Sequence, residues 1–198
     1  MMQILLIRHG ESEADILQVH EGRADFELTE LGRTQVKAMA AYVNAKFPPD
    51  FIWASPLKRA SETAAVLAEQ VGCPLHFEGD LMEFNNGALA GLSFEEAKRY
   101  PVPKELHERV EQGESAIEFR MRIEVIFSKI ISDPRYERIA IVAHGGVINN
   151  MLRSFFKMPV NKDYYFKNGD TAIHLIEIKS AERIVHFLND TSHLLARS

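Results

Sequence analysis

The sequence predicts an α/β fold: a three-layer sandwich with a mostly parallel central sheet, helices on both faces and an antiparallel edge. Short apolar segments alternate with longer amphipathic segments along the 198 residues, which is the pattern of β–α units around a parallel sheet. The last two apolar segments are separated only by the residues KSAE, which indicates a hairpin at one edge. Because 46% apolar content is enough for a substantial core, we expect residues 1–198 to form a single domain.

The expected strands are short apolar runs bounded by polar or turn-forming residues. They are residues 3–8, 51–54, 75–77, 138–143, 171–178 and 183–188. The segments 171–178 and 183–188 form the expected hairpin, and the other runs are candidates for the parallel part of the sheet.

Helices are expected between these strands, where apolar residues recur at helical spacing. The segment 30–46 follows Thr29, a suitable N-cap. The segment 56–70 begins with a proline after Ser55, which we expect to be its N-cap. The other two helices are expected over residues 115–132 and from near Val147 onward, after the glycine pair 145–146.

Residues 91–114 form the least regular region of the sequence. Pro101 and Pro103 interrupt any long helix there, and the charges are mixed. We therefore expect an irregular insertion at about 91–114, over a sheet edge and with no more than short helical pieces.

The composition argues against several classes of partner. The formal net charge of −5 gives no overall attraction to nucleic acid or to an anionic membrane. No segment approaches the length of a membrane span, and the apolar run at residues 1–7 is too short for a signal peptide. The single cysteine, Cys73, excludes an intrachain disulfide. We expect a cytoplasmic protein that binds neither nucleic acid nor membrane, and a homodimer is compatible with the sequence.

Residues with chemical potential follow the predicted strands. Ligands of such sheets bind beyond the carboxyl ends of the strands, so these positions are the first candidates for a site. Because neighbouring side chains of a strand point to opposite faces, the first two candidates can share a crevice only if the chain leaves the strand near Arg8, where Gly10 permits a turn. The candidates at the strand ends are Arg8, His9, Arg59, Glu83 and His144.

Each candidate alone also has a purely structural interpretation. A histidine at a strand end is often a hydrogen-bonded core residue, and Arg59 could pair with Glu62 or Glu69 on its helix. Glu83 could be a charge at a helix end. Their shared placement favours a site, because two guanidinium groups attract an oxyanion and match the geometry of phosphate.

Five segments, in this order, resemble the histidine phosphatase superfamily, also called the phosphoglycerate mutase-like family. The segments are LLIRHGES, LTELGRTQ, SPLKRASETA, LMEFNNGALAGLS and VAHGGVI. The resemblance covers most of the chain and leaves residues 91–114 and the last fifty loosely constrained. It implies that His9 is the nucleophile that becomes phosphorylated, that Glu83 gives a proton to the leaving group, and that the phosphoryl oxygens are bound by Arg8, Arg59 and His144.

The residue types suit that chemistry. A neutral imidazole is a competent nucleophile towards phosphorus, and a covalent intermediate divides hydrolysis into two easier steps. Two arginines and a protonated His144 would stabilise the transition-state charge, so no metal and no cofactor are expected. Glu83 must hold a proton, and an apolar setting of Leu81, Met82 and Phe84 would raise its pKa.

The sequence departs from the family pattern at two places. Asp15 replaces a frequent asparagine whose amide helps hold phosphate, so we expect its carboxylate to turn away, to be protonated, or to pair with a cation such as Arg23. In NNGALAG, Leu89 and Ala90 replace an aromatic and an acidic residue, which makes the pocket wall less polar.

Two further residues are candidates for substrate binding. Ser12 either donates to phosphate or caps a helix, and the sequence does not separate these roles. Arg23 either contacts the non-reacting part of a substrate or forms a surface ion pair with Glu21 or Asp25. Asp15 joins them in the candidate substrate-binding set.

The function we predict is hydrolysis of a small phosphorylated metabolite, a phosphomonoester, through a phosphohistidine. One alternative is a cofactor-dependent phosphoglycerate mutase, and another is a non-catalytic regulatory module that binds a phosphoester. The stretch between Glu83 and His144 is mixed in charge, whereas such mutases resemble longer chains with a basic segment there, which favours the phosphatase. A metallohydrolase built on His9, His144 and Glu83 is a third reading, which the neighbouring arginines disfavour by repelling a cation.

Overall fold

The computed structural model describes residues 1–161, 163–180 and 182–195. Its strands are β1 (Met2–Arg8), β2 (Phe51–Ala54), β3 (Leu75–Phe77), β4 (Arg138–Ala143), β5 (Ile173–Lys179) and β6 (Glu182–Asp190). They form a six-stranded sheet in the order β3-β2-β4-β1-β5-β6. The strands β1 to β4 pair in parallel, whereas β5 runs antiparallel to β1 and β6. The predicted sheet, with its antiparallel hairpin at one edge, is confirmed.

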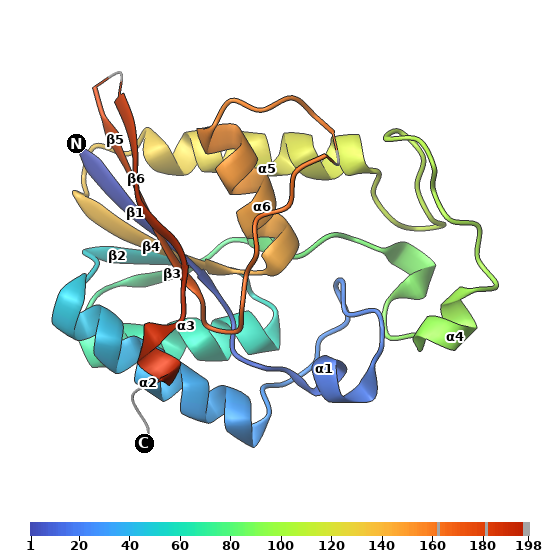
Figure 1. Cartoon of the computed structure of the whole chain (residues 1–198), viewed down its shortest axis with the longest axis horizontal. Coiled ribbons are helices and arrows are strands. Elements are labelled where there is room, and N and C mark those ends of the chain that lie inside the picture. The colour runs from blue at the N-terminus through green and yellow to red at the C-terminus, as the bar shows by residue number, and fades with distance from the viewer. Residues whose placement is uncertain (162, 181, 196–198) are drawn as a thin grey trace.

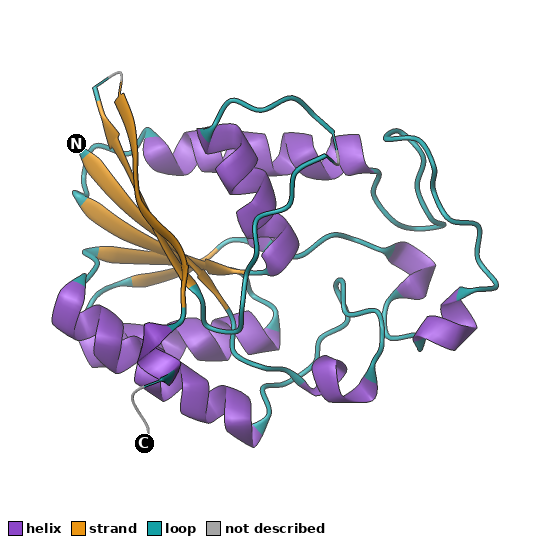
Figure 2. Cartoon of the chain, viewed as in Figure 1, coloured by secondary structure: helices purple, strands orange, loops and turns teal. Residues whose placement is uncertain are grey.

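Helices cover both faces of this sheet (Figures 1 and 2). They are α2 (Glu30–Lys46) and α3 (Lys58–Val71) on one face, and α5 (Ala116–Ile131) and α6 (Gly145–Phe155) on the other. The central strand β1 is buried on both faces, because Ile4 and Leu6 pack with α5 and α6 while Leu5 and Ile7 pack with α2 and α3. An almost continuous apolar strand is what two covered faces require, and the predicted sandwich is confirmed.

The caps of α2 and α3 differ in how well the sequence predicted them. Thr29 caps α2 as expected, and its hydroxyl accepts the amide hydrogen of Gly32 at 2.9 Å. The prediction for α3 is wrong by two residues, because its N-cap is Leu57 and not Ser55. The hydroxyl of Ser55 instead lies 2.8 Å from the ring of His144, so Ser55 belongs to the candidate site described below.

Two other helices begin where their N-cap residues dictate. Ser115 caps α5: its hydroxyl accepts from the amide of Glu118 at 3.2 Å, and the Glu118 carboxylate accepts from the amide of Ser115 at 2.7 Å. The helix α6 begins at Gly145, two residues earlier than expected, because His144 is already its N-cap.

The insertion between β3 and α5 has little regular structure. It holds the short helix α4 (Phe94–Ala97), and the backbone from Lys98 to α5 runs through turns. Another short helix, α1 (Glu13–Leu17), follows β1. Its N-cap is Ser12, so the helix-capping role considered for Ser12 is confirmed. In the part of the chain that the structure describes, we find no helix with both the length and the apolar content to cross a membrane.

Candidate active site

The carboxyl ends of β1 and β4 bring two histidines together. Arg8, the last residue of β1, pairs with Ala143, the last residue of β4. One residue further along each strand, the rings of His9 and His144 have their centroids 5.1 Å apart. The amide of His9 still donates to the carbonyl of Ala143 at 3.1 Å. The chain therefore leaves β1 at Arg8, as the sequence analysis required.

Gly10 allows the chain to pass close to α2 after it leaves β1. A Cβ atom there would lie 2.7 Å from the carbonyl oxygen of Gly32 and 2.9 Å from a methyl group of Val36. The φ angle of Gly10 is not positive, so its backbone conformation does not itself require glycine. Glycine is therefore needed at residue 10 for the close approach of two segments.

His9 is neutral and presents an unprotonated nitrogen. Its Nδ1 lies 2.8 Å from the carbonyl oxygen of Gly10, which only accepts, so Nδ1 carries the hydrogen. Its Nε2 is therefore unprotonated, and its lone pair accepts a hydrogen bond from Nε of Arg59 at 3.3 Å. Burial lowers the pKa of His9 well below its ordinary value, and the charges of Arg59 and Arg8 lower it further. This is the protonation state that a nucleophile needs.

Arg59 is the second residue of α3 and is fully buried. Its two terminal nitrogens donate to the backbone carbonyls of Ala24 and Gly22, both at 2.9 Å. The remaining donor, Nε, lies between His9 and Glu21, whose Oε1 is 3.0 Å away. Glu62, the partner considered in the sequence analysis, binds Arg33 instead. The alternative of a solvated helix residue is wrong for Arg59.

The guanidinium group of Arg8 contacts one backbone carbonyl and two carboxylates. Its Nη1 donates to the carbonyl of Asn168 at 2.9 Å and lies 3.3 Å from Asp170. Burial raises the pKa of Asp170, while the charge of Arg8 opposes that rise. Nη2 of Arg8 is 3.9 Å from Asp15. The loop before β5 therefore contributes to the site, although no motif of the sequence pointed to it.

His144 is fully buried, and Nε2 of its ring lies 2.8 Å from the hydroxyl oxygen of Ser55. The same oxygen accepts the amide hydrogen of Leu57 at 3.3 Å. Nδ1 of His144 has no hydrogen-bond partner among the residues that the structure describes. Burial, followed by the charge of Arg59, lowers the pKa of His144 well below its ordinary value. This direction favours a neutral His144 in the site without ligand. The protonated His144 expected in the transition state stays a prediction.

Glu83 lies after the short 3₁₀ turn η1 (Gly79–Leu81) and holds its carboxylate against backbone amides. The amide of Phe84 donates to Oε1 at 2.7 Å and the amide of Gly146 donates to Oε2 at 2.8 Å. Burial raises the pKa of Glu83 from its ordinary value, although these two amides and Arg59 oppose the rise. A Cβ atom at residue 146 would overlap the Glu83 carboxylate, so a larger residue there would displace this carboxylate from its position. The predicted direction of the pKa shift is confirmed.

One guanidinium fixes the loop that carries Glu83. Nη1 of Arg122 donates to the carbonyls of Asp80 and Met82, at 2.7 and 2.9 Å, and its Nη2 donates to the carbonyl of Glu83 at 3.3 Å. The same side chain pairs with Glu114 at 2.6 Å. The sequence analysis missed Arg122, because nothing in its place on α5 marks it.

Arg23 contacts the Glu83 loop and Glu114, and it does not contact the partners that the sequence analysis considered for it. Its Nε donates to the carbonyl of Glu83 at 3.3 Å, and its Nη2 lies 3.8 Å from Glu114. The proposed surface pair with Glu21 or Asp25 is therefore wrong. The structure places Arg23 beside the loop of the candidate acid.

Asp15 and Ser12 lie near Arg8 and Glu21. One oxygen of Asp15 accepts from the amide of Ser12 at 2.9 Å, and the other faces Arg8, so the suggested pairing with Arg23 is wrong. Ser12 is the N-cap residue of α1, and its hydroxyl donates to Glu21 at 2.6 Å. In the site without ligand, the Ser12 hydroxyl is thus occupied by a carboxylate.

Glu21 is the residue at the centre of the site that the sequence analysis did not recognise. Its carboxylate contacts Arg59 and Ser12, and Oε2 lies 3.8 Å from Nε2 of His9. No strand end or helical spacing marks this loop position. The one available signal is the residue type itself, a carboxylate close to Arg23 in the loop after the first site segment.

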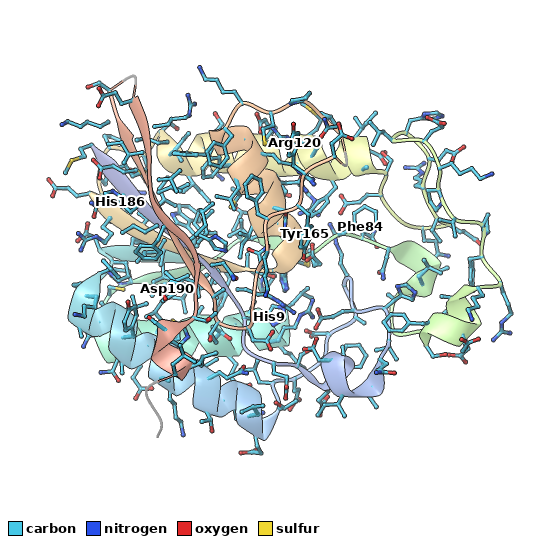
Figure 3. The ribbon with its side chains drawn as sticks, in the orientation of Figure 1. His9, Phe84, Arg120, Tyr165, His186 and Asp190 are labelled. Atoms are coloured by element: carbon cyan, nitrogen blue, oxygen red, sulfur yellow. The ribbon has the colours of Figure 1, made fainter. Side chains whose placement is uncertain are left out.

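A cavity of about 390 Å³ lies beside Glu83, between α5, α6, the insertion and the loop after α6. Phe84 and Gly146, whose amides hold the carboxylate, are part of its wall. The apolar part of the wall includes Leu89, where the sequence predicted a less polar surface. Figure 3 shows the place of Phe84 and Tyr165 relative to His9. Other apolar lining residues are Leu106, Val110 and Phe119.

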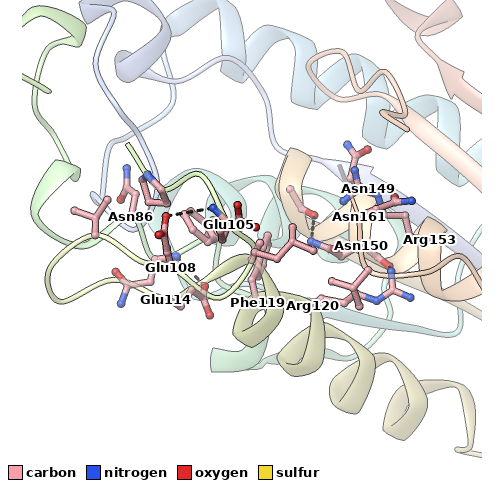
Figure 4. A pocket seen from close by; sticks show the side chains of 18 of the residues that line it. Asn86, Glu105, Glu108, Glu114, Phe119, Arg120, Asn149, Asn150, Arg153 and Asn161 are labelled. Carbon is pink, nitrogen blue, oxygen red and sulfur yellow. Dashed lines mark hydrogen bonds between the residues drawn. The ribbon is translucent and has the colours of Figure 1, made fainter. Parts of the chain in front are cut away.

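The charged side chains of this cavity are separated by sign. In Figure 4, Glu105, Glu108 and Glu114 lie towards one end, whereas Arg120 and Arg153 lie towards the other. A molecule that fills the cavity therefore meets an apolar middle, an acidic end and a basic end.

Metal-ligating side chains do not gather in this site. Within residues 1–161, 163–180 and 182–195, no group of three or more His, Cys, Asp or Glu side chains is arranged to hold a metal ion. His9, His144 and Glu83 thus do not form such a group among the described residues.

Comparisons with known proteins agree with the resemblance of the five segments. The family model for the histidine phosphatase superfamily (branch 1) matches residues 4–191. A glucosyl-3-phosphoglycerate phosphatase of Mycobacterium tuberculosis is 30% identical, with 80% of this chain and 77% of that protein covered. A probable phosphoglycerate mutase, GpmB, of Erwinia tasmaniensis is 27% identical, with 98% and 95% covered. The crystal structure of a phosphoserine phosphatase mutant from Entamoeba histolytica in complex with phosphoserine has a TM-score of 0.81 and 25% identity, covering 98% of this chain and 100% of that chain.

Proposed function

Because the chain belongs to the histidine phosphatase superfamily, we propose that it hydrolyses small phosphomonoesters through a phosphohistidine on His9. The observation that carries this proposal is the state of His9. Its Nδ1 hydrogen is committed to the carbonyl of Gly10, so Nε2 is unprotonated, and its lone pair faces Nε of Arg59 in a buried site. The relatives described above carry names of phosphatases of phosphoserine and of glucosyl-3-phosphoglycerate, which are small phosphate esters.

The first chemical step would form the N–P bond. Nε2 of His9 attacks phosphorus while the P–O bond to the leaving group breaks, and Glu83 gives its proton to the departing oxygen. In the second step the Glu83 carboxylate takes a proton from water, whose oxygen attacks phosphorus. The N–P bond breaks, and inorganic phosphate and neutral His9 result. The raised pKa of Glu83 supports the first role, since the carboxyl must be protonated when the ester binds.

Three groups would hold the phosphoryl oxygens. Arg8 and Arg59 supply positive charge, and Nδ1 of His144, which has no partner in the described part of the chain, would donate to a phosphoryl oxygen when it carries the ring hydrogen. The amides at the beginning of α6 lie next to His144 and add partial positive charge. These groups supply the stabilisation that a divalent cation gives in other phosphoryl-transfer enzymes, so we propose that turnover needs no metal.

The leaving group would occupy the cavity beside Glu83. The cavity wall includes Phe84 and Gly146, which hold the candidate acid, so a group bound there has its ester oxygen next to a proton donor. The apolar middle of the cavity favours an ester whose organic part is itself largely apolar. The finer identity of the metabolite stays open to experiment.

Mutase activity is the second candidate, and it is suggested by the name of the GpmB relative. A phosphoglycerate carries negative charge on both its phosphate and its carboxylate. The acidic end of the cavity, at Glu105 and Glu108, disfavours such a molecule, whereas Arg120 and Arg153 at the other end attract it, so the charges of the cavity do not separate the two activities. We place hydrolysis first because two of the three relatives described above carry the names of phosphatases. Transfer of phosphate from a bisphosphoglycerate to a monophosphoglycerate at a rate above hydrolysis would reverse this order.

The test is a panel of phosphate esters assayed in EDTA. We expect hydrolysis of an aryl phosphate and of at least one metabolite ester. When the reaction is quenched without acid, we also expect phosphate bound covalently to the protein, in a linkage that is stable to alkali and labile to acid. Activity that disappears in EDTA and returns with Mg²⁺ contradicts the metal-free mechanism. A protein that binds esters without turnover is instead the regulatory module. The cytoplasmic location stays a prediction from the sequence, in which one cysteine cannot form an intrachain disulfide.

A further inference from the structure

We infer that Glu21 is an internal anion that competes with the phosphoryl group for Arg59 and so keeps the affinity of the site for free phosphate low. This inference rests on the proposed function, because it takes the space at Nε2 of His9 to be the phosphoryl site. Its starting point is a chemical conflict: a carboxylate lies where an anionic substrate has to bind.

The positions of the Glu21 oxygens define the conflict. Oε2 lies 3.8 Å from Nε2 of His9. A phosphorus atom ready for attack must come within about 3–3.5 Å of that nitrogen. The phosphoryl oxygens around it would then fall in the space that the Glu21 carboxylate now fills. Glu21 has to turn aside, or share the space at a cost in repulsion.

The donors of Arg59 show what the two anions compete for. Both terminal nitrogens of Arg59 donate to carbonyls of the loop at Gly22 and Ala24. Its Nε is the donor next to His9, and it lies 3.0 Å from Oε1 of Glu21. The arginine donor closest to the reacting nitrogen is therefore already bound to a carboxylate.

A second donor is taken in the same way. The Ser12 hydroxyl, a candidate donor to phosphate, lies 2.6 Å from Oε1 of Glu21. One carboxylate oxygen thus binds a hydroxyl and a guanidinium together, which is the contact pattern of a phosphoryl oxygen. Glu21 is about one-fifth exposed, so it borders solvent and has room to turn outward.

The charge around Arg8 makes the competition matter. Arg8 lies 3.3 Å from Asp170 and 3.9 Å from Asp15, and Arg59 lies against Glu21. Each of the two arginines therefore already faces at least one carboxylate. With both site histidines neutral, an incoming dianion gains little net charge attraction unless a carboxylate moves away. For an enzyme whose product is phosphate, this arrangement favours release.

The experiment compares Glu21→Gln with the wild-type protein and with the control Glu27→Gln. The first substitution keeps the shape of the side chain and removes its charge, whereas Glu27 is an exposed partner of Lys58 outside the site. Binding of inorganic phosphate and of vanadate is measured by calorimetry at one pH. We expect both ligands to bind about tenfold more tightly to Glu21→Gln, which corresponds to about 1.4 kcal/mol, because the substitution removes the repulsion between the carboxylate and the anion. Glu27→Gln should bind them as the wild type does.

A second variant keeps the test sharp if the introduced glutamine itself binds Arg59. Glu21→Ala removes both charge and hydrogen bonding, and it should also bind phosphate more tightly than the wild type. Unchanged or weaker binding by both variants overturns the inference, because Glu21 would then position Arg59 for the ligand and would not compete with it. Calorimetry needs no turnover, so it tests the competition separately from the proposed hydrolysis. If the wild-type protein hydrolyses no ester but the Glu21 variants bind phosphate more tightly than it does, the proposed hydrolysis is refuted and the competition at Arg59 is supported.

Discussion

The proposed phosphoryl side of the site and the proposed leaving-group side are built from different kinds of structure. Around His9 most groups come from strand ends and the first turns of helices, and His9, Arg59 and His144 are buried. The cavity beside Glu83 is walled by turns of the insertion and the loop after α6, together with two helix faces. The difference indicates that the sheet fixes the chemistry, whereas the irregular segments choose the organic part of the substrate.

The two sides also differ in what a substitution should disturb. On the phosphoryl side, removal of one group leaves a buried polar partner without its hydrogen bond, which costs about 1–3 kcal/mol in addition to any catalytic loss. On the cavity side, a smaller apolar side chain removes contact area and leaves the chemistry in place. The following predictions separate the two sides by comparing substrates.

The largest effect is expected for His9→Ala, which removes the nucleophile. Turnover of every ester should fall at least roughly a thousandfold, whatever its leaving group. No acid-labile phosphate should be trapped on the protein. His144→Ala is the matched variant from the neighbouring strand end, and it should lose rate but keep labelling. Rapid-quench labelling that finds phosphate on His144 would reverse the roles of the two histidines.

The second effect depends on the leaving group. Glu83→Gln should slow hydrolysis of an alkyl phosphate by roughly a hundredfold, because the alkoxide then leaves without a proton. The same variant should slow p-nitrophenyl phosphate far less, since that anion leaves unaided. The measurement is kcat/KM for both esters in the wild type and the variant. Equal losses for both esters would give Glu83 a positioning role in place of the acid role.

A smaller effect is expected from the cavity wall. Leu106→Ala should lower kcat/KM about tenfold for an aryl ester large enough to fill the cavity, because several buried methyl and methylene contacts are lost. A small ester such as phosphoserine should be hydrolysed at an almost unchanged rate. Leu31→Ala, at an exposed position of α2, is the control. Equal losses for large and small esters would show that the cavity does not hold the leaving group.

The smallest effect is expected from pH. Glu83 has a raised pKa, and its protonated form is the active one, so that form is lost as the pH rises through the raised pKa. The kcat/KM for an alkyl ester divided by that for an aryl ester should therefore fall by a few-fold, and by no more than tenfold, for each pH unit above the raised pKa of Glu83. His9 should cause no loss near its ordinary pKa on the acid side, because burial lowers its pKa well below that value. A ratio that stays constant with pH contradicts a proton from Glu83.

The sequence was informative where geometry follows from the sheet itself. Arg8, His9 and His144 could be predicted as neighbours because parallel strands end at one edge, and β1 and β4 are adjacent. Glu83 was placed by the resemblance of its segment, and the structure puts its carboxylate on the amide of Gly146, beside His144. The roles of these residues stay proposals.

The sequence was uninformative where the path of a loop decides the contact. Glu21 reaches Arg59 because the loop after α1 folds back and presents the carbonyls of Gly22 and Ala24 to the same guanidinium. Ser55 was assigned to a helix cap, but it binds His144, whose position depends on packing between β2 and β4. Contacts between segments so distant in sequence leave no periodic pattern to read.

The attachment of the Glu83 loop to Arg122 has a consequence for how new specificities could arise. The course of this loop is set by its carbonyl groups, which one guanidinium binds at three points, and its side chains take no part in that binding. The side chain of Phe84 can therefore be exchanged in directed evolution to reshape the cavity while the acid stays in register. Lysine at position 122 would end this freedom, because a single ammonium group cannot span three carbonyls and a carboxylate.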